Sequence, residues 1–190
     1  MNYYIADLHF GHKNIIKFDK RPFFSVEEMN KTLIDNWNSV VTNNDTVVIL
    51  GDFCWGLEDD WIKILDQLNG DKRLIRGNHD LKNMSQALKS RFKSIKDYDE
   101  IKDDGKRVLV SHYPIPCYRG DYNHDIIHLF GHVHITAEND FIEHLREYIS
   151  KNDNRDDDSK HKCQFYNVGC MMPYMDYTPK TLKEIINSNT

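Results

Sequence analysis

The chain has 190 residues, a hydrophobic share of 39%, a charged share of 29% and a formal net charge of −5. This length favours a single domain, residues 1–190, which can bury roughly 70% of its unfolded surface without disulfide support. The composition is typical of a globular protein, and no apolar run is long enough to cross a membrane. The acidic balance disfavours an extended nucleic-acid surface, because such surfaces cluster Lys and Arg.

The cysteine spacing indicates a reducing compartment. Four cysteines lie far apart in the sequence and form no CxxC pair, so a zinc ribbon or a thioredoxin-type site is not predicted. Asp7 and His9, so early in the chain, are not typical of a signal peptide. We therefore expect a cytoplasmic protein whose thiols are reduced.

Apolar runs that end in polar residues predict buried strands that run into loops. In chain order these runs are 3–6, 46–50, 73–76, 107–110, 126–130 and 165–169. Apolar residues at helical spacing predict one helix after the capping box of Ser25 and Glu28, and another over 57–68. A last helix is expected to begin with Thr178 as N-cap and Pro179 at its first position. The early alternation implies βαβ units, whose ligands bind beyond the carboxyl ends of the strands.

Side chains with oxygen or nitrogen donors follow these strand ends, and none of them is a thiol. They are Asp7, His9, Asp52, Asn78, His112, His132 and His134. Carboxylate and imidazole ligands together suit Mn, Fe, Co, Ni or Zn better than Ca or Mg, which prefer oxygen alone. These donors exceed the needs of one tetrahedral ion, so we predict two divalent ions that share a bridging carboxylate.

The motifs that carry these residues resemble, in order, those of the calcineurin-like metallophosphoesterase superfamily. They are Asp7-Leu8-His9, Gly51-Asp52, Gly77-Asn78-His79-Asp80, Ser111-His112 and Gly131-His132-Val133-His134. A single DxH or GxH is a weak signal, whereas GNHD followed by GHVH in this order is specific, and ordinary polar strand ends do not explain it. The segments 167–169 and 177–179 are similar to the closing part of small prokaryotic and phage members.

The resemblance implies a four-layer α/β/β/α sandwich and a dinuclear metal centre, with Mn as the ion we expect first. The implied ligands are Asp7, His9 and His134 for one ion, Asn78, His112 and His132 for the other, and Asp52 as the bridge. Two ions about 3.5–4 Å apart lower the pKa of a shared water and clamp the oxygens of an in-line displacement. A metal-bridging hydroxide is therefore expected to attack phosphorus.

Other residues are candidates for roles beside the metals. The resemblance leaves His79 free of metal, so it can protonate the leaving oxygen or stabilise charge on the phosphoryl group. Asp80 is expected to orient a ligand or its loop. His12 is a candidate substrate contact, with a surface-loop role as the alternative. Among Arg21, Arg76 and Arg119 we prefer Arg119 as a phosphate contact, because it follows the SHYP segment; a solvated side chain is the alternative.

The chain departs from the protein serine/threonine phosphatase branch, which carries a GDxxDRG pattern. Here the segment reads GDFCWG, so Trp55 replaces the Asp that pairs with the catalytic His in that branch. A phosphoprotein substrate is therefore disfavoured, and a small phosphate ester or a nucleotide is expected. Glu58 or Asp59 supports His79 only if the loop folds back.

Two other functions stay open from the sequence. One is a non-catalytic protein-interaction module on the same fold, although such members typically lose ligands or the GNHD histidine, and this chain keeps both. The other is a nuclease, which the acidic charge and the lack of a basic stripe disfavour. The remaining histidines expected in the core or on the surface are His124, His128, His144 and His161. The acidic run 156–158 is expected in a solvated loop, with calcium binding as the alternative.

Overall fold

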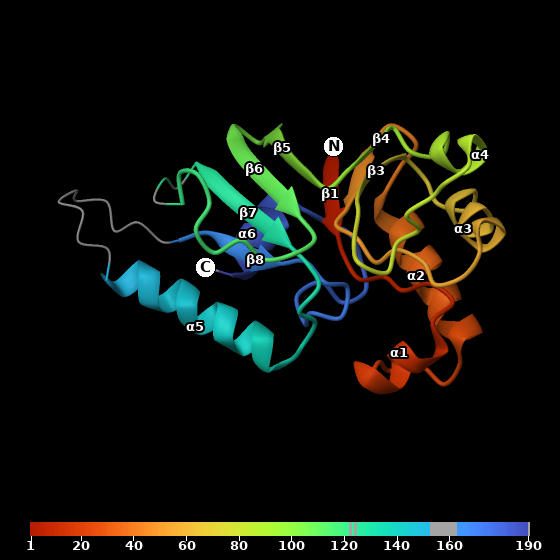
Figure 1. Cartoon of the computed structure of the whole chain (residues 1–190), viewed down its shortest axis with the longest axis horizontal. Helices are drawn as coiled ribbons and strands as arrows, with labels where there is room; N and C mark the ends of the chain where they lie inside the picture. The colour runs from red at the N-terminus through yellow and green to blue at the C-terminus, as the bar shows by residue number, and fades with distance from the viewer. Residues whose placement is uncertain (122, 124, 153–162, 190) are drawn as a thin grey trace.

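The computed structural model describes residues 1–121, 123, 125–152 and 163–189. His124, His161 and the acidic run 156–158 lie outside these residues. Two sheets form the centre of the fold, with helices on their outer faces (Figure 1). The first sheet has the strand order β4-β3-β2-β1-β9 and the second the order β5-β6-β7-β8.

The first sheet contains the expected βαβ units. Its members are β1 (Asn2–Ile5), β2 (Thr46–Ile49), β3 (Asp71–Ile75), β4 (Ser94–Lys96) and β9 (Lys180–Thr181). Strands β1 to β4 are parallel, and only the short β9 runs antiparallel to β1. All four residues of the run 47–50 are fully buried, as a parallel strand covered on both faces requires.

The second sheet lies against the first and meets it at one end. Its members are β5 (Tyr98–Asp103), β6 (Lys106–Ser111), β7 (Ile126–Phe130) and β8 (Phe165–Asn167). The last three strands are parallel, and β5 pairs antiparallel with β6. Ala6 forms an isolated parallel bridge with Gly169, and Ala6 N donates to Val168 O at 2.8 Å. The carboxyl ends of β1 and β8 therefore adjoin each other.

Helices cover the outer face of each sheet (Figure 1). The helices of the described chain are α1 (Lys13–Phe18), α2 (Val26–Val40), α3 (Glu58–Leu65), α4 (Gln86–Lys89), α5 (Ala137–Asn152) and α6 (Leu182–Ser188). Helix α1 lies beyond the ends of the strands and not over a sheet (Figure 1). Ser25 caps α2 as expected, since its Oγ accepts from the Glu28 backbone N–H at 3.1 Å. No helix in the described part of the chain is long and apolar enough to span a membrane.

Alternate residues of β6 show how the layers are stacked. Val108 and Val110 belong to the large core that also holds Trp37 of α2 and the strands of the first sheet. Leu109, between them, belongs to a second core with Ile142 of α5. One face of the second sheet therefore packs on the first sheet and the other on α5, which confirms the four-layer α/β/β/α sandwich.

The predicted start of the last helix is wrong by three residues. Thr181, and not Thr178, is the N-cap of α6, and it forms a capping box with Glu184. Lys180 and Thr181 pair with Tyr4 and Tyr3 as β9, so the backbone stays extended through this stretch. Pro179 therefore precedes a strand, and the helix begins only where the pairing ends.

Candidate metal centre

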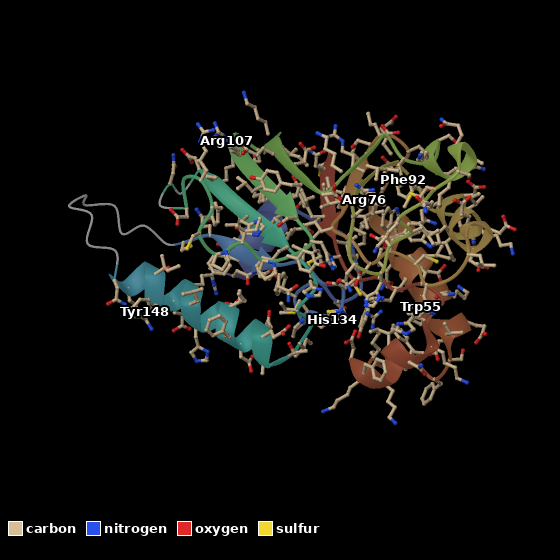
Figure 2. The ribbon with its side chains drawn as sticks, in the orientation of Figure 1. Trp55, Arg76, Phe92, Arg107, His134 and Tyr148 are labelled. Carbon is tan, nitrogen blue, oxygen red and sulfur yellow. The ribbon has the colours of Figure 1, made fainter. Side chains whose placement is uncertain are left out.

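The fold brings the predicted ligands to the junction of the two sheets. They follow the carboxyl ends of five parallel strands: Asp7 and His9 after β1, Asp52 after β2, Asn78 after β3, His112 after β6, and His132 and His134 after β7. Figure 2 shows His134 near the middle of the molecule, between its two halves. Residues separated by more than a hundred positions thus share one site.

Left-handed backbone turns direct these side chains. The φ angles are 55° at Asp7, 50° at His9, 53° at Asp52, 72° at His132 and 45° at His134. This region costs about 1–2 kcal/mol for a residue with a Cβ, and such strain persists where the surrounding structure enforces it, often at functional sites. In the first turn, Asp7 N donates to Gly51 O at 3.1 Å and His9 N to Asp52 O at 2.9 Å.

Two buried carboxylates lie at the centre of the site. Asp7 has no exposed surface, and its oxygens accept from the backbone N–H of His132 at 3.1 and 3.0 Å. Asp52 is 2% exposed, and its Oδ1 accepts from the backbone N–H of His79 at 2.9 Å. Burial raises the pKa of Asp7 to about 6. A bound cation would offset the cost of keeping both groups ionised here.

One group of donors fits a metal ion by distance. Donor atoms of Asp7, His9, Asp52 and His134 all lie within 4.8 Å of one another. The Nε2 atom of His9 is buried, has no hydrogen-bond partner among the described residues, and lies 3.6 Å from Asp52 Oδ2. Burial, with the charge of His134, lowers the pKa of His9 to about 2. A neutral imidazole with a free lone pair is the form that binds metals.

A second group of donors lies on the other side of Asp52. His112 Nε2 is 3.6 Å from the same Asp52 Oδ2 and 3.0 Å from Asn78 Oδ1. His112 Nδ1 donates to Leu50 O at 2.8 Å, which leaves Nε2 as an acceptor that faces another acceptor. A shared cation stabilises such a pair. The His132 ring completes this group, with its centroid 5.0 Å from that of His112.

Behind the first group, Asp19 and Arg21 form a support that the sequence did not indicate. Asp19 Oδ1 accepts from His134 Nδ1 at 2.7 Å, and Asp19 Oδ2 pairs with Arg21 at 2.9 Å. Arg21 is buried and also donates to Asp7 O at 2.8 Å and Leu8 O at 2.9 Å. Burial lowers the pKa of His134, but the hydrogen bond to Asp19 outweighs it and the pKa is raised. Arg21 therefore holds the loop and is not free for substrate.

Asp80 binds three backbone groups and ties the GNHD loop to the end of β2. Its Oδ2 accepts from Asp52 N at 3.1 Å and Gly77 N at 2.8 Å, and its Oδ1 from Phe53 N at 2.9 Å. A Cβ on Gly77 would lie 2.2 Å from Asp52 Oδ1, so only glycine allows this approach. Asp80 thus orients the loop that carries Asp52.

The open side of the site carries aromatic rings. The His79 side chain is exposed, and its ring centroid lies 5.8 Å from that of His9 and 5.5 Å from that of Trp55. Trp55, labelled in Figure 2, is 47% exposed and stacks on His12 at 4.3 Å and 14°. Trp55 therefore lines the site beside His79.

The remaining candidates lie away from this cluster. Glu58 Oε1 accepts from Ser85 N at 2.6 Å, so it is engaged with the start of α4 and does not support His79. Arg76 pairs with Asp97 at 2.8 Å. Arg119 is exposed in the loop that follows β6, and its role as a phosphate contact stays a prediction.

Comparison with known proteins defines the class. The calcineurin-like phosphoesterase family model matches residues 3–165, so the chain belongs to this family, and the resemblance is confirmed. Uncharacterized protein MJ1445 of Methanocaldococcus jannaschii is 39% identical over 152 residues, which cover 78% of each chain. Gene 66 protein of Mycobacterium phage L5 is 42% identical over 81 residues, 41% of this chain and 39% of that protein.

A solved structure matches nearly the whole chain. The crystal structure of the protein of unknown function AQ665 from Aquifex aeolicus aligns with a TM-score of 0.64 at 29% identity, covering 99% of this chain and 98% of that one. The four-layer arrangement is therefore shared over the full length. The reaction and the substrate do not follow from these relatives and have to be argued from the site.

Proposed function

We propose that this chain is a phosphoester hydrolase that uses two divalent metal ions to cleave a phosphodiester or phosphomonoester of a small molecule or nucleotide. The observation that carries the proposal is the position of Asp52 Oδ2, which lies 3.6 Å from both His9 Nε2 and His112 Nε2. One carboxylate oxygen equidistant from two imidazole lone pairs is suited to bridge two cations.

In this proposal each ion has its own set of ligands, and the ligands are those expected from the motifs. Asp7, His9 and His134 hold one ion, Asn78, His112 and His132 hold the other, and Asp52 bridges them. Mn is proposed first, with Fe, Co, Ni or Zn as alternatives, because oxygen and imidazole donors suit these ions. The ions supply Lewis-acid charge and an activated water at neutral pH.

The protein's own groups then position the ester and move the proton. His79 lies at the open side, where its ring is free to donate a proton to the departing oxygen. Its backbone N–H meanwhile holds Asp52 Oδ1 at 2.9 Å, so the loop is fixed independently of the ring. His12 and Trp55 form a wall beside it that can contact the ester.

The whole chain, 1–190, is proposed to act as one domain, because residues of both sheets contribute to the large core. The retained donors and the free His79 favour catalysis over a purely protein-binding role. The net charge of −5 favours a small ester over a nucleic acid.

Metal removal and reconstitution test the proposal. Chelator-treated protein is expected to be inactive, and Mn is expected to restore hydrolysis of bis-p-nitrophenyl phosphate. Activity on this diester should equal or exceed activity on phosphoserine peptides. Full activity in protein shown to be metal-free by elemental analysis would contradict the proposal. Two bound ions without turnover of any ester would favour the interaction module, and steeply salt-dependent oligonucleotide binding would favour a nuclease.

A further inference from the structure

A cavity of about 500 Å³ opens beside the candidate metal centre. It is lined by the segment after β6, the segment after β7 and the first turns of α5, including Tyr113, Pro114, His132, Val133, Glu138 and Phe141. Its volume lies in the range of small-molecule sites, which are mostly apolar with a few polar groups.

The cavity is continuous with the centre through His132. This residue is a candidate metal ligand and also forms part of the cavity wall. The Tyr113 ring lies 4.5 Å from the His132 ring at 67°, and 5.1 Å from the His112 ring. An ester whose phosphoryl group reaches these histidines therefore has the cavity next to its organic part.

The wall that carries Tyr113 is held by hydrogen bonds. Ser111 Oγ donates to Tyr113 O at 2.7 Å, and Ile115 N donates to His128 Nε2 at 3.0 Å. His128 is fully buried in β7, and its Nδ1 lies 3.3 Å from Leu109 O. This side of the cavity is therefore formed before any ligand binds, which reduces the entropy lost on binding.

The opposite wall is the start of α5, and it is fixed in the same way. Asn139 is buried, and its Oδ1 accepts from Asn167 Nδ2 of β8 at 2.9 Å. This bond fixes the start of α5 relative to the second sheet, and with it Glu138 and Phe141, which line the cavity.

The chemistry of the lining indicates the ligand. Tyr113 and Phe141 leave 50% and 65% of their surface exposed, while Val133 is 5% exposed and contributes an apolar wall. Exposed aromatic faces beside an apolar wall suit a planar heterocycle, since stacking of a base on an aromatic ring contributes about 1–3 kcal/mol. Glu138 offers a carboxylate that accepts hydrogen bonds from sugar hydroxyls and disfavours a further anionic group.

We propose that this cavity binds the nucleoside part of a nucleotide ester, with the base against Tyr113 and Phe141 and the sugar hydroxyls at Glu138. The inference rests on the proposed function, because it places the phosphoryl group of the same molecule at the metal centre. The inferred substrates are nucleosides that carry a single phosphate ester and no other charged group.

A binding experiment tests the cavity without turnover. Adenosine, which has no phosphate to lose, is titrated into the full-length, Mn-loaded protein and its binding is followed by isothermal titration calorimetry. Phe141→Ala is expected to raise the Kd for adenosine about tenfold. Tyr148→Ala is the matched control, because both residues are on α5 and 65% exposed, seven positions apart and so on nearly the same face. Tyr148 lies near the far end of α5 from His134 (Figure 2) and does not line the cavity.

A kinetic experiment then separates this inference from the proposed function. Thymidine 5′-p-nitrophenyl phosphate and methyl p-nitrophenyl phosphate share a leaving group and a charge and differ in the nucleoside. Wild type and Tyr148→Ala are expected to favour the thymidine ester at least tenfold in kcat/KM, and Phe141→Ala should bring this ratio close to one.

The outcomes are distinct. Equal Kd values for adenosine in Phe141→Ala and Tyr148→Ala, or binding of octanol in place of adenosine, would overturn the nucleoside assignment. Equal hydrolysis of both esters by the wild type would do the same while leaving the proposed function intact. Adenosine binding as expected, with no hydrolysis of either diester or of the monoester p-nitrophenyl phosphate, would contradict the proposed function and leave the cavity assignment standing.

Discussion

His134 donates its Nδ1 hydrogen to Asp19 Oδ1 across 2.7 Å, although 115 positions separate the two residues in the chain. This bond fixes the tautomer of the imidazole, so the lone pair on Nε2 faces Asp7 Oδ1 at 3.8 Å. Arg21 holds the other oxygen of Asp19 at 2.9 Å. Carboxylates that orient a ligating histidine in this way strengthen metal binding.

Asp19→Asn is therefore expected to weaken Mn affinity about 10- to 100-fold, the usual effect of removing such a support. The amide still accepts a hydrogen bond but loses the charge that favours the His134 tautomer. Isothermal titration calorimetry with Mn measures the effect, and Asp35→Asn, which changes an exposed aspartate on α2, is the control. Equal affinities in the two variants would show that Asp19 serves only the loop.

Asp52→Asn should weaken the binding of both ions, because the proposed bridge loses its charge where two cations repel each other. Asp52 Oδ1 keeps its bond from His79 N at 2.9 Å in the amide, so the loop is expected to stay in place. Elemental analysis after dialysis against a fixed Mn concentration gives the stoichiometry. Loss of one equivalent with normal binding of the other would show that Asp52 is not a bridge.

His128 is expected to make the chain less stable in mild acid. Its ring is buried, which lowers its pKa to about 4, against about 6.5 in the unfolded chain. Between these two values only the unfolded chain takes up the proton, so the free energy of unfolding falls as the pH is lowered. Above about pH 6.5 and below about pH 4, His128 does not change the free energy of unfolding with pH. The loss attributable to His128 between pH 7.5 and 5 is about 2 kcal/mol.

Urea unfolding at these two pH values, in excess chelator, measures that loss. His128→Gln should reduce it, because glutamine cannot take up the proton, whatever its effect on stability at pH 7.5. Burial also lowers the pKa of His9, so His9 adds its own loss of stability in acid. The informative quantity is therefore the difference between the loss in wild type and the loss in His128→Gln. His144→Gln, at an exposed position of α5, is the control. Parallel losses in wild type and His128→Gln would exclude the buried histidine as the cause.

The sequence predicted every strand with a continuous buried run, including the edge strand β8, but missed β4, β5 and β9, which are edge strands without such a run. The run 47–50 is fully buried and continuously apolar, so it stands out in the sequence. Strand β5 has one buried residue, Ile101, and its other side chains are at least partly exposed, so its sequence resembles that of a loop. Helix α5 buries only Asn139 and Ile142 and exposes Phe141, so no apolar stripe marks it.

The site shows the same division. The motifs indicated the donors, because each follows the end of a buried strand. The contacts that support these donors could not be predicted from local sequence, since Asp19 meets His134 only after the two sheets have packed. Left-handed backbone at Asp7 and Asp52 could not be predicted either, because aspartate tolerates this conformation but does not require it, and the hydrogen bonds of the finished fold impose it.

The last prediction concerns His79, whose backbone and ring have separate tasks. The backbone N–H holds Asp52 Oδ1 at 2.9 Å, and any side chain at this position leaves that bond in place. The ring is exposed beside Trp55, at a centroid distance of 5.5 Å. His79→Asn is therefore expected to keep two bound ions while kcat falls about 10²- to 10⁴-fold, the range for loss of a general acid.

The leaving group decides between the two roles open to the ring. If His79 protonates the departing oxygen, its loss is large for an alkoxide leaving group and small for p-nitrophenolate, which departs without a proton. If it stabilises charge on the phosphoryl oxygens, the two losses are similar. We expect the acid role, because no carboxylate in the described part of the chain hydrogen-bonds the ring and holds its proton. A leaving-group series with uniform losses would exclude that role, and loss of metal from His79→Asn would make the residue a ligand.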